Sequence, residues 1–443
     1  MATHSAGFVL AAALAAASLL PPNLALGSQT PMDFAEKVAW DLAEEHFAPV
    51  VTRMSPEMAA ALPAKKLSEI WASLTHQFGA FGGLGDATSE TKAGVTLVRV
   101  PVKFRTRVLD LEIAVASERI VGFFIAPHED PAAAWTAPAY VDPSKFRDVE
   151  VRIGEEPNAL PGTLSLPKGV DKAPVVILVH GSGPQHRDES VGPNRIFRDI
   201  ASGLASRGVA VLRYDKRTKV YPTSFEGLKN PTVTDEVLDD VMLAFDMLKA
   251  RPDIDARDIV VLGHSLGGTL APRIAAANPG VAKIVILAGA TRSLPDIAVA
   301  QTEYLASLNG AADAASAKAI EAMNADAARV RAARPGDEGA PFLGAPLSYW
   351  ADLNTYDPAA VADSLTLPIL ILQGGRDYQV TMADFDRFRS VLADHANVEM
   401  HELPRLNHLF MSGVGPSTPA EYEQPGHVDA EVIDLIANFV SKP

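Results

Sequence analysis

The chain has 443 residues, no cysteine, 48% hydrophobic residues and a formal net charge of −15. That length predicts two or three domains and is sufficient to bury a large hydrophobic core. The apolar content excludes a wholly disordered chain. The acidic charge argues against a nucleic-acid partner, because phosphate binding needs a basic surface, and the lack of cysteine excludes disulfides, thiolate metal sites and a cysteine nucleophile.

The first element in chain order is an uncharged apolar run over residues 8–20. It is too short for an ordinary transmembrane helix and fits the core of a secretory signal peptide, with an uncleaved anchor as the alternative. Small residues at Ala25 and Gly27 place the expected cleavage after Gly27, so residues 1–27 are predicted to be a signal peptide. No later segment is apolar over a membrane-spanning length, and we expect a periplasmic or secreted protein without stable membrane insertion.

Residues 31–126 are predicted to form a small α+β domain. Apolar residues recur at helical spacing near its start, and period-2 alternation, typical of antiparallel strands, follows in residues 95–100, 109–115 and 120–125. The proline-rich segment 127–145 is interpreted as a linker.

Residues 146–443 show a different pattern, in which short continuous apolar runs alternate with helical stretches. The runs are residues 175–179, 209–212, 259–262, 284–287 and 369–372. Strands buried on both faces indicate a mostly parallel sheet, so an α/β doubly wound fold is predicted, with helices on both faces. Residues 291–364 separate two strands by an alanine-rich stretch and are predicted to be a helical cap insertion.

The strongest catalytic pattern is Gly-His-Ser-Leu-Gly at residues 263–267, between an apolar strand and a helix-like segment. A G-x-S-x-G turn in this context is typical of a nucleophile elbow, which presents a serine hydroxyl above the sheet. Ser265 is therefore the candidate nucleophile.

A serine nucleophile needs a base and an acid, which in this arrangement follow it in the order acid, then histidine. Asp377 comes after the strand 369–372 and two glycines, where a ligand-facing acid is expected. The competing carboxylates, which follow no such break, are Asp352, Asp357, Asp363 and Asp384.

His408 is the candidate base, because it lies in a loop between a strand and the last helix. The other downstream histidines are His395, His401 and His427. An oxyanion hole needs two backbone N–H groups. The amide of Leu266 opens the helix after the serine, and the second amide is assigned to Ser182, with Gly181 as the alternative.

Five motifs carry a family resemblance: residues 180–184 (His-Gly-Ser-Gly-Pro), 213–217 (Arg-Tyr-Asp-Lys-Arg), 263–268, 374–377 and 407–408. Together they resemble the α/β-hydrolase superfamily. The first two more narrowly resemble bacterial two-domain carboxylesterases near the serine aminopeptidase and acyl-peptidase branches.

This resemblance covers about residues 146–443 and implies Ser265 as nucleophile, His408 as base and Asp377 as orienting acid. The small domain resembles an uncharacterised domain that precedes such esterases. Residues 217–219 depart from the pattern, since many relatives have a glycine-rich turn there.

The sequence therefore predicts an exported serine carboxylesterase that hydrolyses short-to-medium acyl esters of small molecules through an acyl-enzyme, without a cofactor or metal. A serine peptidase of the aminopeptidase or acyl-peptidase type is one alternative, because the same triad cleaves amides. A non-catalytic cell-envelope binding protein on a hydrolase scaffold is another. The oligomeric state stays open.

Overall fold

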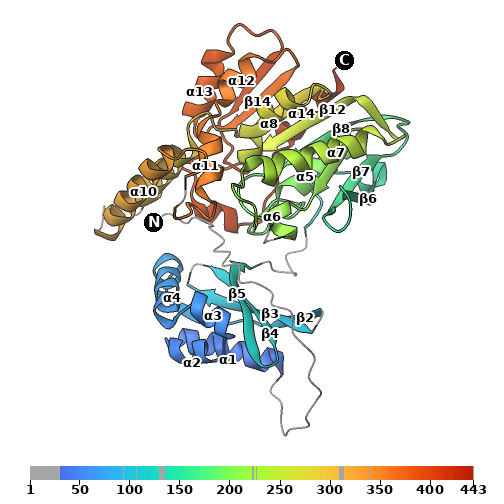
Figure 1. The fold of residues 1–443 in the computed structure, drawn as a ribbon. Coiled ribbons are helices and arrows are strands. Elements are labelled where there is room, and N and C mark those ends of the chain that lie inside the picture. The colour runs from blue at the N-terminus through green and yellow to red at the C-terminus, as the bar shows by residue number, and fades with distance from the viewer. Residues whose placement is uncertain are drawn as a thin grey trace. The chain divides into compact units, whose positions relative to one another are not determined.

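The computed structural model describes residues 30–92, 94–105, 107–128, 135–221, 224–225, 227–308, 314–337 and 339–442. The expected signal peptide, residues 1–27, lies outside the described residues. The chain forms two compact units that divide between residues 131 and 132 (Figure 1). Among the helices of the described ranges, none combines the length and apolarity needed to cross a membrane.

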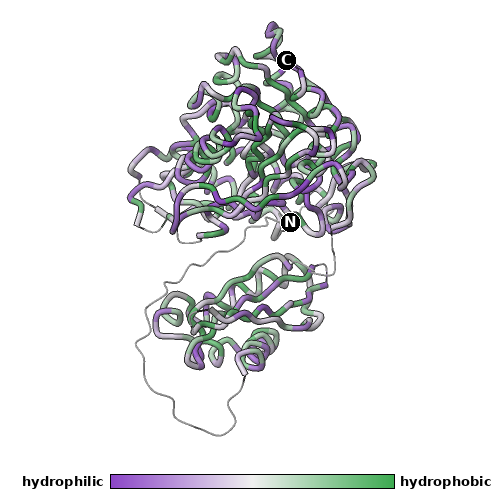
Figure 2. Tube along the Cα trace, turned by 90° about the vertical axis from the view of Figure 1, so that its right-hand side faces the viewer, coloured by the Kyte–Doolittle hydropathy of each residue, from purple (hydrophilic) through white to green (hydrophobic). Residues whose placement is uncertain are grey.

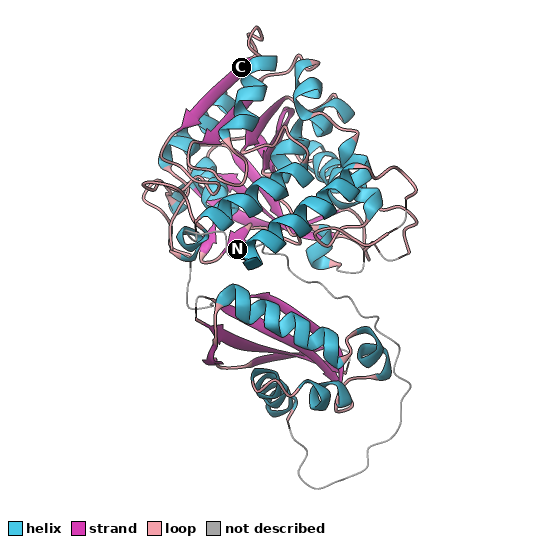
Figure 3. Cartoon of the chain, turned by 90° about the vertical axis from the view of Figure 1, so that its left-hand side faces the viewer, coloured by secondary structure: helices cyan, strands magenta, loops and turns pink. Residues whose placement is uncertain are grey.

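The smaller unit packs helices against an antiparallel sheet (Figure 3). Its elements are α1 (Pro31–Ala43), α2 (Phe47–Thr52), α3 (Pro56–Ala61), α4 (Ala64–Phe78), β1 (Phe81–Leu84), β2 (Thr88–Lys92), β3 (Val95–Phe104), β4 (Val108–Ala116) and β5 (Arg119–Pro127). The strand order is β1-β3-β4-β5, and β2 also pairs with β3. Helical residues such as Val38 and Trp71 share one core with strand residues such as Val100. The predicted small α+β domain is confirmed.

The larger unit is built on an eight-stranded sheet in the order β15-β14-β13-β12-β8-β11-β7-β6. Its strands are β6 (Phe146–Ile153), β7 (Leu160–Pro167), β8 (Ala173–Val179), β11 (Ala210–Tyr214), β12 (Ile254–His264), β13 (Lys283–Leu287), β14 (Ile369–Gly374) and β15 (Val398–Leu403). All neighbours from β11 to β15 pair in parallel, whereas β7 is antiparallel to both β6 and β11. The predicted parallel sheet is confirmed.

Helices cover both faces of this sheet. They are α5 (Ile196–Ala205), α6 (Arg217–Val220), α7 (Asp239–Lys249), α8 (Leu266–Ala277), α9 (Leu294–Ser307), α10 (Ala314–Arg331), α11 (Leu347–Asn354), α12 (Pro358–Asp363), α13 (Met382–Val391) and α14 (Ala430–Ser441). Along β8, Val175 and Ile177 belong to one hydrophobic core and Val176 and Leu178 to another. This alternation explains the continuous apolar runs, and hydrophobic chain accordingly runs through the interior of the unit (Figure 2).

A short hairpin completes the larger unit, formed by β9 (Ser190–Val191) and β10 (Asn194–Arg195). The predicted insertion after β13 is helical and contains α9 to α12. The end of the expected linker 127–145 packs on the larger unit, because Trp135 Nε1 donates to Asp199 Oδ1 over 2.6 Å and Tyr140 Oη donates to Val428 O over 2.9 Å.

Candidate active site

Ser265 lies on a strained turn between β12 and α8. Its φ of 55° and ψ of −115° fall in a region that residues with a side chain rarely adopt. Such strain is typical of a nucleophile elbow, which lifts the serine out of the sheet. The Ser265 hydroxyl accepts no hydrogen bond from the first amides of α8, so Oγ does not act as a helix cap.

Glycines allow the chain to close around this turn. A Cβ on Gly263 would lie 2.0 Å from the carbonyl oxygen of Gly267, and a Cβ on Gly267 would lie 2.1 Å from the carbonyl oxygen of Val179. Real Cβ atoms do not approach backbone so closely, so only glycine fits at either position.

His408 and Asp377 form a buried pair. His408 Nδ1 lies 2.6 Å from Asp377 Oδ2, and both side chains are almost fully buried. The other carboxylate oxygen of Asp377 accepts from the amides of Gln379, at 2.7 Å, and Val380, at 3.0 Å. The acid is thus held from both sides, and the His408 ring keeps Nε2 for another partner.

The loop that carries His408 lies against the serine turn. His264, the residue before Ser265, donates from Nε2 to the backbone carbonyl oxygen of His408 over 2.9 Å. The two imidazole rings have centroids 4.8 Å apart. The ends of β12, β14 and β15 therefore bring the three sequence-predicted residues to one edge of the sheet.

The loop after β8 also contacts the serine turn. A Cβ on Gly181 would lie 3.2 Å from Ser265 Cβ, so this loop touches the serine turn. The Gly181 N–H donates to Glu189 Oε1, whereas Ser182 is exposed. Leu266 is the first residue of α8, where backbone N–H groups have no intrahelical partner.

A buried ion pair lies behind the serine turn and was missed by sequence reasoning. Glu189 Oε2 is 3.2 Å from His264 Nδ1, and both side chains are buried. Burial opposes the charged ring, but the Glu189 carboxylate outweighs it and raises the pKa of His264 above its ordinary value. Burial also opposes charge on Glu189, yet His264 lowers the pKa of this carboxyl group. Glu189 belongs to none of the motifs found in the sequence, so only the tertiary fold reveals this pair.

The competing residues from the sequence have other partners. Asp352 pairs with Arg273, and Asp384 pairs with Arg292 in the interior. Asp357 caps α12, Asp363 pairs with His395, and His427 pairs with Asp199. His401 lies within β15.

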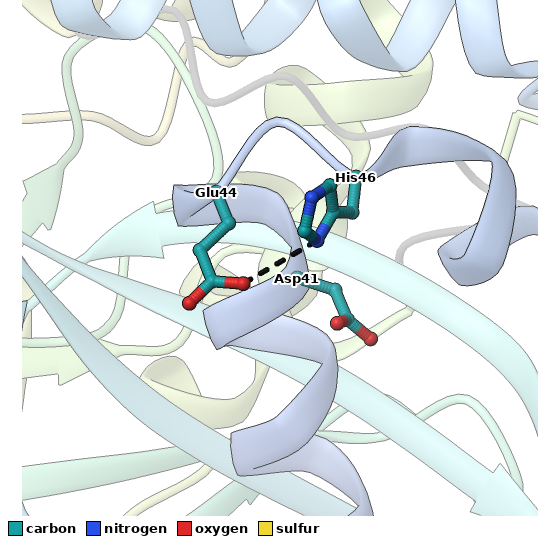
Figure 4. A group of neighbouring side chains, drawn as sticks. All are labelled: Asp41, Glu44 and His46. Carbon is teal, nitrogen blue, oxygen red and sulfur yellow. Dashed lines mark ion pairs between the residues drawn. The ribbon is translucent and has the colours of Figure 1, made fainter.

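The smaller unit contains one group whose geometry would suit a cation among the residues that the structure describes, namely Asp41, Glu44 and His46 (Figure 4). Glu44 and His46 are exposed, with Glu44 Oε2 3.3 Å from His46 Nδ1. Asp41 is buried and already paired with Arg53. A carboxylate that is neutralised by arginine is a poor cation ligand, so we assign Asp41 a structural role.

Comparison with known proteins identifies relatives of both units. The family described as "Alpha/beta hydrolase family" matches residues 176–424, and "Protein of unknown function (DUF3887)" matches residues 35–123. Esterase EstD of Thermotoga maritima is 38% identical over 405 residues, which span 90% of this chain and 93% of EstD.

The chain is also similar to two solved structures. Est1E from Butyrivibrio proteoclasticus is 20% identical, with a TM-score of 0.44 over 66% of this chain and 99% of its own. The Pyrococcus horikoshii acylaminoacyl peptidase is 13% identical, with a TM-score of 0.44 over 82% of this chain and 56% of its own. With the family match and the extent of its similarity to EstD, this chain belongs to the alpha/beta hydrolase family.

Proposed function

We propose that this protein is a serine carboxylesterase in which Ser265, His408 and Asp377 form the catalytic triad. The observation that carries the proposal is the buried His408–Asp377 pair, 2.6 Å long, beside a serine turn at positive φ. A serine on a strained turn, followed along the chain by a carboxylate and then an imidazole, supplies the parts that acyl transfer requires.

The pair determines how the proton moves. The Asp377 carboxylate accepts the Nδ1–H of His408, so Nε2 carries the lone pair that receives the Ser265 proton. Ser265 Oγ then bonds to the ester carbonyl carbon, and the carbonyl π electrons move to the oxygen. When this tetrahedral intermediate collapses, His408 gives the proton to the departing alcohol. Water repeats the sequence on the acyl-enzyme and releases the acid.

The oxyanion is stabilised by backbone amides. We assign the donors to Leu266, at the helix N-terminus, and to Ser182, because the Gly181 N–H already donates to Glu189. Each donor of this kind typically contributes ~10²–10³ in rate.

The similarity to a protein named esterase EstD favours esters over amides as substrates. The test is hydrolysis of a p-nitrophenyl acyl series from acetate to palmitate, with aminoacyl anilides alongside. We expect turnover of short and medium esters and little cleavage of anilides. Fast anilide cleavage with weak ester turnover would assign the protein to the peptidases.

The serine assignment is tested by S265A, with S390A as the matched control. Ser390 is an exposed serine on α13. S265A should lose ester turnover and keep the wild-type melting temperature, and S390A should keep both. Retained turnover in folded S265A would refute the proposal.

We also propose export, from the apolar run at residues 8–20. N-terminal sequencing of the protein from a periplasmic or culture fraction should begin at Ser28. Recovery of full-length chain from the cytoplasm alone would refute export.

A further inference from the structure

Lys216 is a buried cation that the proposed triad does not use. Its side chain is 3% exposed, and Nζ lies 3.0 Å from Glu236 Oε1. Burying an ammonium group costs several kcal/mol of desolvation, and an ion pair offsets this cost without explaining why the charge is there. The remaining contact of Nζ shows what the charge faces.

Lys216 Nζ donates to the backbone carbonyl oxygen of Gly181 over 3.0 Å. That carbonyl belongs to the same peptide group as the Ser182 N–H. A trans peptide is planar, with its C=O and N–H pointing in opposite directions. An ammonium group held on the carbonyl side therefore turns the Ser182 N–H to the other side.

Lys216 also binds the loop after β8 at a second point, beyond Ser182. Its backbone N–H donates to the carbonyl oxygen of Gln185 over 3.0 Å. The neighbouring peptide is held as well, because the Gly181 N–H donates to Glu189. Two buried ion pairs, Lys216–Glu236 and Glu189–His264, thus anchor opposite sides of one glycine residue.

We propose that Lys216 is a positioning residue of the oxyanion hole, which orients and polarises the Gly181–Ser182 peptide so that the Ser182 N–H meets the developing oxyanion. This inference rests on the proposed function. The ammonium group draws electron density toward the Gly181 carbonyl and so strengthens the N–H of the same amide as a donor. Because the donor is fixed before the substrate arrives, little reorganisation is needed in the transition state.

The Lys216–Glu236 pair also contacts the helical insertion. Glu236 accepts from Tyr349 Oη over 2.7 Å, and Tyr349 lies on α11. Residues far apart in the sequence therefore support one peptide of the active site.

The experiment compares K216M with K283M in the full chain. Lys283 is also buried and donates from Nζ to backbone carbonyls, those of Val440 and Lys442, but it opens β13 at the end of the strand away from Ser265. Both variants lose a buried cation, and only K216M loses contact with the oxyanion loop. The substrates are a p-nitrophenyl ester and its thionoester, in which sulfur replaces the carbonyl oxygen and accepts hydrogen bonds more weakly.

We expect K216M to lower kcat for the ester by about 10- to 100-fold, less than the loss of a donor, with KM within about twofold. The ester-to-thionoester ratio of kcat/KM should fall by about tenfold. K283M should leave that ratio unchanged. If K216M does not fold, E236Q takes its place, with a smaller fall in the same ratio.

A folded K216M with wild-type kcat, or one that loses ester and thionoester turnover equally, would overturn the inference. Its failure is distinct from failure of the proposed function. If S265A is inactive and K216M is normal, only the role of Lys216 is wrong, whereas an active S265A would overturn the triad itself.

Discussion

The imidazole of His264 donates from Nε2 to the backbone carbonyl oxygen of His408 across 2.9 Å, and its Nδ1 faces Glu189 Oε2 at 3.2 Å. A carbonyl oxygen can only accept, so Nε2 carries a proton, and the Glu189 carboxylate favours a second proton on Nδ1. The His264 ring thereby joins the serine turn, the histidine loop and the loop after β8. The proposed site depends on buried charge as much as on the triad.

Asp377 should be required for turnover. D377N keeps an oxygen acceptor for the Gln379 and Val380 amides but directs N–H groups at His408 Nδ1. The ring then favours the tautomer with its proton on Nε2, which cannot accept the serine proton. Steady-state kinetics should show kcat lower by about 10³–10⁴-fold.

D384N is the control for D377N. Asp384 is also fully buried, but its ion-pair partner is Arg292. This variant should lower the melting temperature and leave kcat near the wild-type value. If D377N retained a tenth of wild-type kcat, Asp377 would not be the orienting acid.

Breaking the Glu189–His264 pair should destabilise the larger unit. E189Q removes the carboxylate that faces the buried His264 ring, and loss of one partner of a buried pair costs about 3–5 kcal/mol. Urea unfolding measures this loss. E150Q removes the far more exposed partner of Arg187 and should cost less than about 1 kcal/mol. Equal unfolding midpoints for the two variants would contradict the role of the buried pair.

Acid should destabilise the larger unit through His180. Burial lowers the pKa of His180 to about 4, whereas an unfolded histidine titrates near ~6.5. Between these values the unfolded chain binds more protons, so the free energy of unfolding falls as pH drops below neutral, by about 2 kcal/mol at pH 5. This contribution to pH dependence is absent above the unfolded pKa.

H180F tests that assignment. The His180 ring packs against Phe197 and Tyr214, with centroids 5.1 and 5.3 Å away, so an aromatic replacement suits the site. Urea unfolding of the larger unit between pH 7 and pH 5 should show a shallower acid dependence than in the wild type. An unchanged slope would assign the acid sensitivity to other groups.

Tyr349 should influence catalysis from a distance. Y349F removes the hydroxyl that binds Glu236 but keeps the Lys216–Glu236 pair, so kcat should fall only about two- to fivefold. Y304F is the matched control, because Tyr304 Oη donates instead to Ser417 O. A similar fall in both variants would mean that the Glu236 contact has no special role.

The doubly wound sheet could be predicted because its central strands are buried on both faces and therefore read as continuous apolar runs. The two antiparallel strands, β6 at the edge of the sheet and β7 beside it, were not found by this criterion. Most of β6 alternates between partly buried and exposed positions, with Ile153 alone fully buried, and the prolines near the two ends of β7 (Pro161 and Pro167) obscure its pattern.

The candidate site could be predicted in part for the same reason. Ser265 and Asp377 each follow an apolar strand and a glycine turn, which makes them visible in the sequence. Glu189 and Lys216 lie on loops, and their importance comes from a glycine peptide that only the folded chain brings to them. The sequence therefore predicts the reacting groups but not the buried charged residues, Glu189 and Lys216, that contact the Gly181 backbone.

The most direct test of the account is labelling of the full chain with a fluorophosphonate, which phosphonylates an activated serine with loss of fluoride. Mass spectrometry of the digested protein should show one adduct per chain, on Ser265, and D377N should react far more slowly. An adduct on another serine, or no adduct on folded protein, would contradict the account.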